Sequence, residues 1–164
     1  MMNSHTGTAS WADAHFADIC RSPLPRGLRE EARGMSWDGF LAAYGHSTGP
    51  LRLGQWECTD PQRTSACLGP QVRHYRATLA VGDRIGTSCA AASGPIAALT
   101  AMLYERGIAL EMLNFHQFEM GRDTVTFIRG TDGVRDEWAM GWAEDCTQSA
   151  LRAMVAVANR LATR

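Results

Sequence analysis

The chain contains no lysine, because all 16 of its basic residues are arginine. A lysine amine is the group that forms Schiff bases with carbonyl substrates, so this type of covalent catalysis is excluded. The arginines are scattered singly along the chain, and the formal net charge is −1. We therefore expect no nucleic-acid partner, since binding to a phosphate backbone depends on clustered basic side chains.

The chain also lacks any apolar run long enough to cross a membrane. Its first ten residues have neither the basic head nor the apolar stretch of a signal peptide. Apolar residues make up 45% of the sequence and charged residues 20%, which is the balance of an ordinary soluble domain. We expect a cytoplasmic protein with no membrane partner.

Spacings typical of metal or redox sites are missing as well. The five cysteines are odd in number and widely spaced, with no C-x-x-C pair, so we interpret them as reduced thiols, most of which pack in the interior. The five histidines form no H-x-H pair and no helical i, i+4 pair. The sequence therefore predicts no metal site and no cofactor.

An internal repeat decides the predicted fold. In its first copy, residues 53–58, 75–81 and 85–91 have strand character, and Gly82-Asp83 provides a hairpin turn. A helix opens at Ser93-Gly94-Pro95 and closes at Gly107.

The second copy has strands over 110–120, 124–128 and 137–143, with a turn over 130–133. A helix follows, with Asp145 as its N-cap and Leu151, Met154 and Leu161 on its apolar stripe. The predicted class is α+β: two repeated β-β-β-α units that bury their apolar surfaces together as a sandwich.

A helical arm precedes this sandwich. Trp11, His15, Phe16 and Ile19 recur at helical spacing, and residues 37–44 form a second helical stretch after Ser36. We assign residues 1–50 to the arm and residues 51–164 to the repeated domain.

Three segments of the repeats resemble the C-terminal regulatory region of α-isopropylmalate synthases: residues 94–99 (GPIAAL), 107–113 (GIALEML) and 149–160 (SALRAMVAVANR). In the arm, residues 24–31 and 37–44 resemble the segments that precede that region. The resemblance implies a leucine-sensing, allosteric, dimer-forming domain of leucine biosynthesis. The chain is too short to include the family's catalytic barrel, so the synthase reaction itself is excluded.

The resemblance also implies a site for an amino-acid-like ligand, whose carboxylate would lie at a helix N-terminus. By position, the ligand-binding residues are Gly94, Ile96, Ala97, Met112, Phe115, Glu119, Trp142, Ala143 and Asp145.

The alternative is that this pocket serves as an enzyme active site for an amino-acid-like or acyl substrate. The candidate catalytic residues are then His116, Glu119, Asp145 and Cys146. Three structural interpretations compete with this one. His116 and Glu119 fall on opposite faces of a strand unless a bulge intervenes, Cys146 packs as a small buried residue, and Asp145 simply caps its helix.

The sequence is compatible with three alternative functions. The first is a dimeric module that senses an amino-acid-like or 2-oxo-acid-like ligand for a separate barrel synthase or another pathway enzyme. The second is a recruited enzyme, and the third is a dimerisation scaffold. The sequence identifies neither the ligand nor the regulated partner.

Overall fold

The computed structural model describes residues 11–45, 48–60 and 72–163. The first repeat is an antiparallel sheet of three strands, in the order β1-β2-β3, followed by a helix. Its elements are β1 (Leu51–Cys58), β2 (Arg73–Val81), β3 (Arg84–Ala92) and α4 (Pro95–Glu105). Gly82 has a φ of 60° in the β2–β3 turn, and Gly107 has a φ of 83° just after α4, so both lie in the left-handed region that favours glycine.

The second repeat has the same plan, with sheet order β4-β5-β6. Its elements are β4 (Glu111–Met120), β5 (Asp123–Thr131), β6 (Asp136–Ala143) and α5 (Cys146–Ala162). The predicted pair of β-β-β-α units is therefore confirmed.

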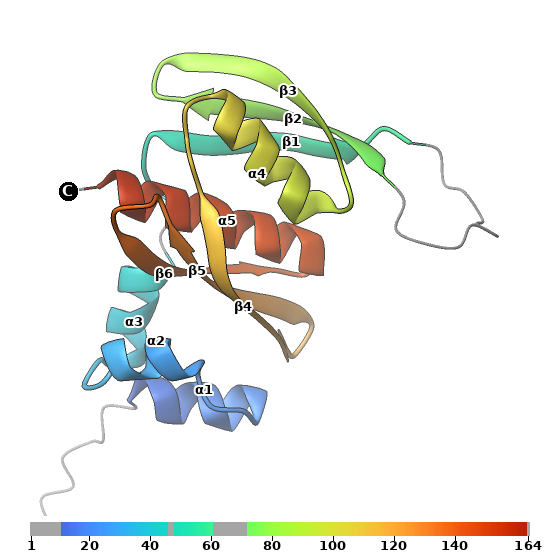
Figure 1. Cartoon of the computed structure of the whole chain (residues 1–164). Helices are drawn as coiled ribbons and strands as arrows, with labels where there is room; N and C mark the ends of the chain where they lie inside the picture. The colour runs from blue at the N-terminus through green and yellow to red at the C-terminus, as the bar shows by residue number, and fades with distance from the viewer. Residues whose placement is uncertain (1–10, 46–47, 61–71, 164) are drawn as a thin grey trace, which may run out of the picture.

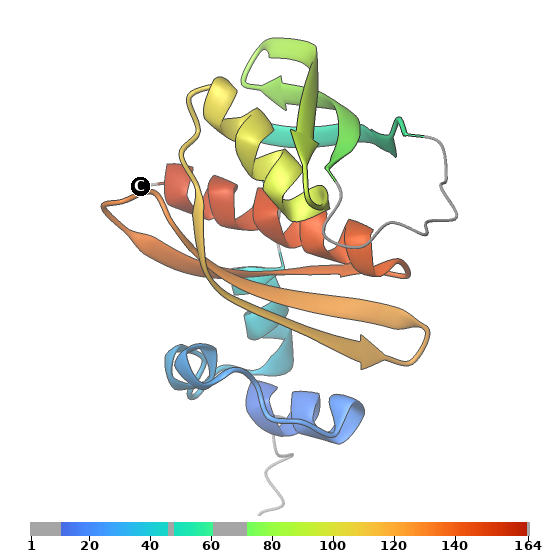
Figure 2. The ribbon, with the colours of Figure 1, turned by 45° about the vertical axis from the view of Figure 1, so that its right-hand side comes forward.

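Both repeat helices lie between the two sheets (Figures 1 and 2). The layers follow one another as the sheet β1–β3, the helices α4 and α5, the sheet β4–β6, and the N-terminal helices. The N-terminal ends of α4 and α5 lie at the same end of the sandwich in both views.

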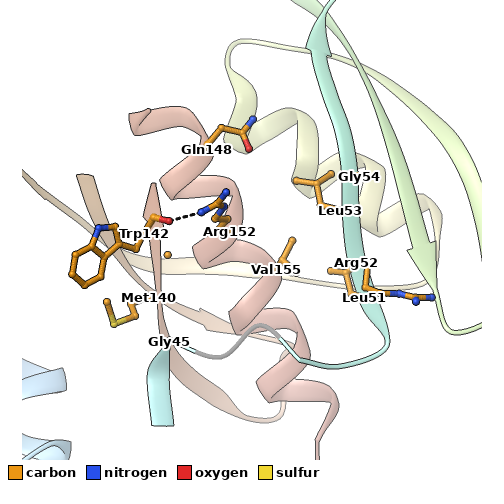
Figure 3. A pocket seen from close by; sticks show the side chains of 11 residues that line it. Gly45, Leu51, Arg52, Leu53, Gly54, Met140, Trp142, Gln148, Arg152 and Val155 are labelled. Atoms are coloured by element: carbon orange, nitrogen blue, oxygen red, sulfur yellow. Dashed lines mark hydrogen bonds between the residues drawn. The ribbon is translucent and has the colours of Figure 1, made fainter. Parts of the chain in front are cut away.

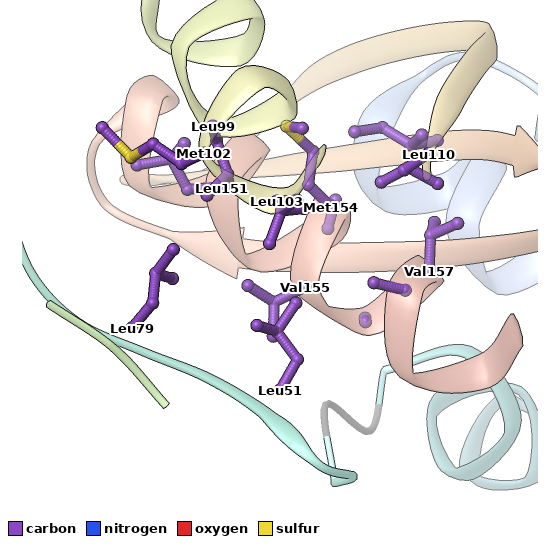
Figure 4. Close-up of a cluster of buried hydrophobic side chains, with 14 of the residues drawn as sticks. Leu51, Leu79, Leu99, Met102, Leu103, Leu110, Leu151, Met154, Val155 and Val157 are labelled. Atoms are coloured by element: carbon purple, nitrogen blue, oxygen red, sulfur yellow. The ribbon is translucent and has the colours of Figure 1, made fainter. Parts of the chain in front are cut away.

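One apolar cluster fills the space between the sheets (Figure 4). Leu51 and Leu79 enter it from the first sheet, and Ile128 and Ala139 enter it from the second. Between them lie Leu99, Met102 and Leu103 of α4 together with Leu151, Met154, Val155 and Val157 of α5. The apolar stripes read from the sequence thus face this common core, so both helices are stabilised by tertiary packing.

Helix α5 approaches the second sheet at backbone distance. A Cβ atom built on Gly141 would lie 2.1 Å from Ser149 O and 2.4 Å from Ala153 N, so only glycine fits at this contact. Ser149 Oγ donates to Gly141 O at 3.0 Å and also hydrogen-bonds Thr126 Oγ1 at 2.7 Å. These buried polar groups are satisfied by one another, and they fix α5 on the sheet.

At its other end, α5 is attached to the first sheet through Asn159. This buried side chain accepts a hydrogen bond from Leu51 N and donates one to Leu51 O, both at 2.9 Å. Its amide thus takes the place of a neighbouring strand along the edge of β1.

The arm comprises α1 (Ala12–Cys20), α2 (Arg26–Glu31) and α3 (Trp37–Tyr44). It covers the face of the second sheet that is turned away from α5, where Phe16, Leu28 and Phe40 pack against Phe127 and Trp138. The alternation of β5 and β6 explains the two cores, because successive side chains point to opposite faces. The boundary after residue 50 stays a prediction.

Arg160 of α5 connects the arm to the sandwich through side-chain contacts. Arg160 donates to Ala43 O at the end of α3 and to Glu137 Oε2, and its guanidinium lies 4.8 Å from the centroid of the Tyr44 ring. Burial and the nearby carboxylate of Glu31 raise the pKa of Tyr44 to about 12. The hydroxyl therefore stays protonated and can donate to Glu31 Oε2, which lies 3.3 Å away.

The structure corrects three expectations. Helix α2 was not predicted, because six residues after Pro25 are too few to show a periodic pattern. Strand β5 runs on to Thr131, so the turn begins at Asp132 rather than at Gly130. Cys58, Cys89 and Cys146 are exposed and are not packing residues, while Cys67 lies outside the described residues.

No described helix has the length and apolar character needed to span a membrane.

We predict that Gly141→Ala destabilises the protein strongly. The added methyl group meets the backbone of α5, which can yield only if the helix shifts on the sheet, and the expected loss of unfolding free energy is about 3 kcal/mol. Gly94→Ala is a matched control, because a Cβ atom there meets nothing within 4 Å. Urea unfolding of both variants measures the difference, and equal midpoints would show that α5 does not sit against the sheet at this point.

Candidate functional site

The two candidate catalytic residues of β4 lie on opposite faces of its sheet. His116 pairs with Phe127 and Glu119 pairs with Thr124, so one side chain faces the arm and the other faces away from it. The His116 ring packs 6.2 Å from the Trp138 ring, measured between centroids, while Glu119 is exposed. The expected separation is confirmed, and these two residues do not form a catalytic dyad.

Cys146 and Asp145 stand at the start of α5. Asp145 accepts a hydrogen bond from Gln148 N at 2.8 Å, which confirms its role as N-cap. Cys146 is exposed, which overturns the interpretation that it is buried, and its carbonyl accepts from Gln117 Nε2 at 2.9 Å.

No imidazole is available to activate the Cys146 thiol within the described residues. The histidines there are engaged elsewhere: His15 packs on Trp37, His74 pairs with Asp60, and His116 packs on Trp138. A thiol nucleophile needs such a base or another source of activation. The described residues also contain no group of three or more His, Cys, Asp and Glu side chains placed to hold a metal ion.

The two repeat helices begin differently. At α5 the Asp145 carboxylate occupies the N-terminal amides, whereas Gly94 at the start of α4 has no side chain to do so. Pro95 has no N–H, and no described residue accepts a hydrogen bond from the N–H of Ile96 or Ala97. Space is open around Gly94. The first turn of α4 therefore presents two free donors and the positive end of a helix dipole.

The β4 members of the predicted ligand set are exposed. Met112 and Phe115 retain 40% and 38% of their accessible surface, and their register partners Gly130 and Ile128 place them on the face turned away from the arm. They lie on an edge strand, which has a neighbour on one side only. An apolar stretch on an open sheet edge is a surface that natural proteins usually cover.

A cleft of about 550 Å³ opens between the two sheets (Figure 3). Strand β1 forms one wall, the end of β6 forms the other, and α5 forms the floor. The lining residues are Gly45, Leu51, Arg52, Leu53, Gly54, Met140, Gly141, Trp142, Gln148, Arg152 and Val155. Trp142 is the one member of the predicted ligand set that lines this cleft.

The remaining cleft residues were missed by sequence reasoning, although the α5 members among them carry a signal. Gln148, Arg152, Val155 and Asn159 are spaced 4, 3 and 4 apart, which places them in one row along α5. Three of these four residues are polar and only Val155 is apolar. Gln148, Arg152 and Val155 line the cleft, and the buried Asn159 binds Leu51 of β1. A row of polar residues beside the apolar stripe of a largely buried helix is unusual and indicates a cavity or a partner.

Comparison with known proteins gives two significant relatives, while no protein-family model matches the chain. The chain is 31% identical over 118 residues to the 2-isopropylmalate synthase of Clavibacter michiganensis subsp. michiganensis (strain NCPPB 382), and 30% identical over 118 residues to that of Clavibacter sepedonicus. Each match covers 69% of this chain but only 20% of the synthase, so the chain corresponds to about a fifth of these relatives. Most of the chain is therefore a homologue of one segment of 2-isopropylmalate synthases.

Proposed function

We propose that this chain is a ligand-binding regulatory module that recognises an amino-acid-like or 2-oxo-acid-like molecule. The observation that carries the proposal is the difference between the two helix starts. Asp145 fills the N-terminus of α5 with a carboxylate of the protein, whereas Gly94 leaves the equivalent position of α4 open for a carboxylate from outside. Helix N-termini bind such anions through their free N–H groups.

The homology to part of the 2-isopropylmalate synthases supports this proposal, since residues 94–99 are among those that carry the resemblance to the regulatory region. A module of this kind acts on an enzyme, and we propose a separate barrel synthase or another pathway enzyme as its partner. The recruited-enzyme alternative has no support from the geometry, because His116, Glu119 and Cys146 form no catalytic group in the described chain.

Gly94→Asp tests the proposed site by giving α4 the cap that α5 already has. The new carboxylate would occupy the Ile96 and Ala97 amides, so ligand binding should be lost while helix stability stays equal or rises slightly. The measurement is the melting temperature with branched-chain and aromatic amino acids and their 2-oxo acids, because a ligand of the folded state raises it.

Gly94→Val is the companion variant, which blocks the same turn by bulk without adding a charge. We expect at least one compound to stabilise the original protein and to stabilise neither variant. A full ligand-induced shift in a folded Gly94→Asp protein would contradict the site, and the absence of any stabilising compound would contradict the function.

We also propose that the module is a homodimer. The exposed apolar residues Met112, Leu113 and Phe115 on the open edge of β4 give a surface that a second copy can cover. Light scattering at micromolar concentration should give the mass of two chains, and Leu113→Arg should reduce it to one, because a charge on a strand edge opposes pairing. A monomeric original protein would contradict this proposal.

A further inference from the structure

The cleft between β1, β6 and α5 contains an arginine side chain, Arg152, that pairs with no acidic group among the described residues. Arg152 Nη1 donates to Trp142 O at 2.7 Å, which orients the guanidinium over the cleft (Figure 3). Arg152 forms no ion pair in the described part of the chain, and no Asp or Glu lines the cleft. Its Nε–H and Nη2–H groups, which share one edge of the guanidinium, are left for a carboxylate to bind with both oxygens.

The second arginine of the lining does not share this role. Arg52 extends along the far side of β1, away from the cleft, and its Nη2 donates to Gly82 O at 2.8 Å. Gln148, by contrast, lies one helical turn before Arg152 and lines the same cavity. The polar side-chain groups that α5 contributes to the cleft are thus the guanidinium of Arg152 and the amide of Gln148.

The wall formed by β1 adds backbone hydrogen-bonding groups. Asn159 binds both the N–H and the C=O of Leu51, so these groups point away from β2 and toward α5. Strand geometry repeats every second residue, so the N–H and C=O of Leu53 point to the same side. Asn159 hydrogen-bonds the backbone of Leu51, but no described side chain hydrogen-bonds the backbone of Leu53 in the same way. Leu53 lines the cleft.

The other side chains of the floor and of the β1 wall, Val155 and Leu53, are apolar. The side chains of Leu53 and Val155 lie on the β1 side of the cleft, where they would contact a hydrocarbon body. Strand β6 contributes its backbone around Gly141 instead, because the buried Met140 side chain packs on the opposite face of β6, toward the arm. The volume of about 550 Å³ falls within the range of small-molecule sites, which is about 300–1,000 Å³. Such sites combine apolar side chains with a few convergent polar groups, and this cleft has both, since Leu53 and Val155 lie beside Arg152 and Gln148.

We infer that this cleft is a second ligand site, which binds a small monocarboxylic acid with an apolar body. The carboxylate lies on the free edge of Arg152, the apolar body lies against Leu53 and Val155, and a further polar group of the ligand pairs with the Leu53 backbone. An amine in place of the carboxylate is disfavoured, because it would face Arg152 with no acid nearby. Helix α4 contributes no residue to this cleft, so the site does not depend on the one proposed at Gly94.

The test is a nuclear magnetic resonance titration of the whole chain with butanoate, hexanoate and octanoate. At least one of them should shift the Leu53 backbone amide and the Arg152 Nε–H signals, with a Kd of about 1 mM or tighter. Hexan-1-ol and hexan-1-amine have the same apolar body as hexanoate and should produce no such shifts up to about 10 mM, because neither supplies a carboxylate.

Two variants make the result specific. Arg152→Met keeps the apolar stem and should weaken the Kd about tenfold or more, while Arg52→Met removes an arginine that points away from the cleft and should leave it unchanged. Gly94→Asp should also leave it unchanged, so loss of the α4 site and loss of this site are separable. The inference is overturned if no carboxylate shifts Leu53 and Arg152, if hexan-1-ol shifts them equally, or if a folded Arg152→Met protein binds with undiminished affinity.

Discussion

The contact between α5 and the second sheet is the constraint on which the rest of the structure depends. Gly141 lets the backbone of the helix approach the backbone of β6, and the Ser149–Thr126 hydrogen bond fixes the position of the helix along the sheet. In this position α5 also contacts the first sheet through Asn159 and the arm through Arg160. A single helix therefore positions all the other layers, so displacing it would disturb both apolar cores and both proposed sites.

The doubled architecture gives equivalent positions different roles. Both helices start at one end of the sandwich, yet one start is closed by Asp145 and the other is left open by Gly94. Along α5, Asn159 closes the edge of β1, whereas about two and three turns earlier Arg152 and Gln148 line an open cleft beside the same strand. Repetition thus supplies a pair of similar frames, and single residues decide which helix start is closed by a carboxylate and which stays open.

Much of the fold could be predicted from the sequence, because its signals are local. The alternation in residues 75–81, the turn at Gly82-Asp83 and the stripe ending at Leu161 all depend on neighbouring residues, and all are confirmed. Helix α2 escaped prediction because its stability comes from Leu28, which is buried against distant parts of the chain.

The site was harder to predict, because it depends on contacts between distant segments. The separation of His116 from Glu119 follows from strand geometry alone and was anticipated. The cleft could not be predicted, because Leu53 and Arg152 are nearly a hundred positions apart in the sequence. They come together only because α5 packs against both sheets. The exposure of Cys146 could not be predicted either, because no local sequence pattern shows which other segments cover the start of a helix.

The most direct measurement of this arrangement is amide hydrogen exchange at Leu51 and Leu53. Both N–H groups point to the same edge of β1, but only the first is bound by Asn159, while the second faces the cleft. We predict that the Leu53 amide exchanges about a hundredfold faster than the Leu51 amide after correction for intrinsic rates, because it can be reached without unfolding. Equal protection of the two amides would mean that the edge of β1 is closed along its length, and it would contradict the account of α5 as a helix that seals one end of this edge and leaves the other open.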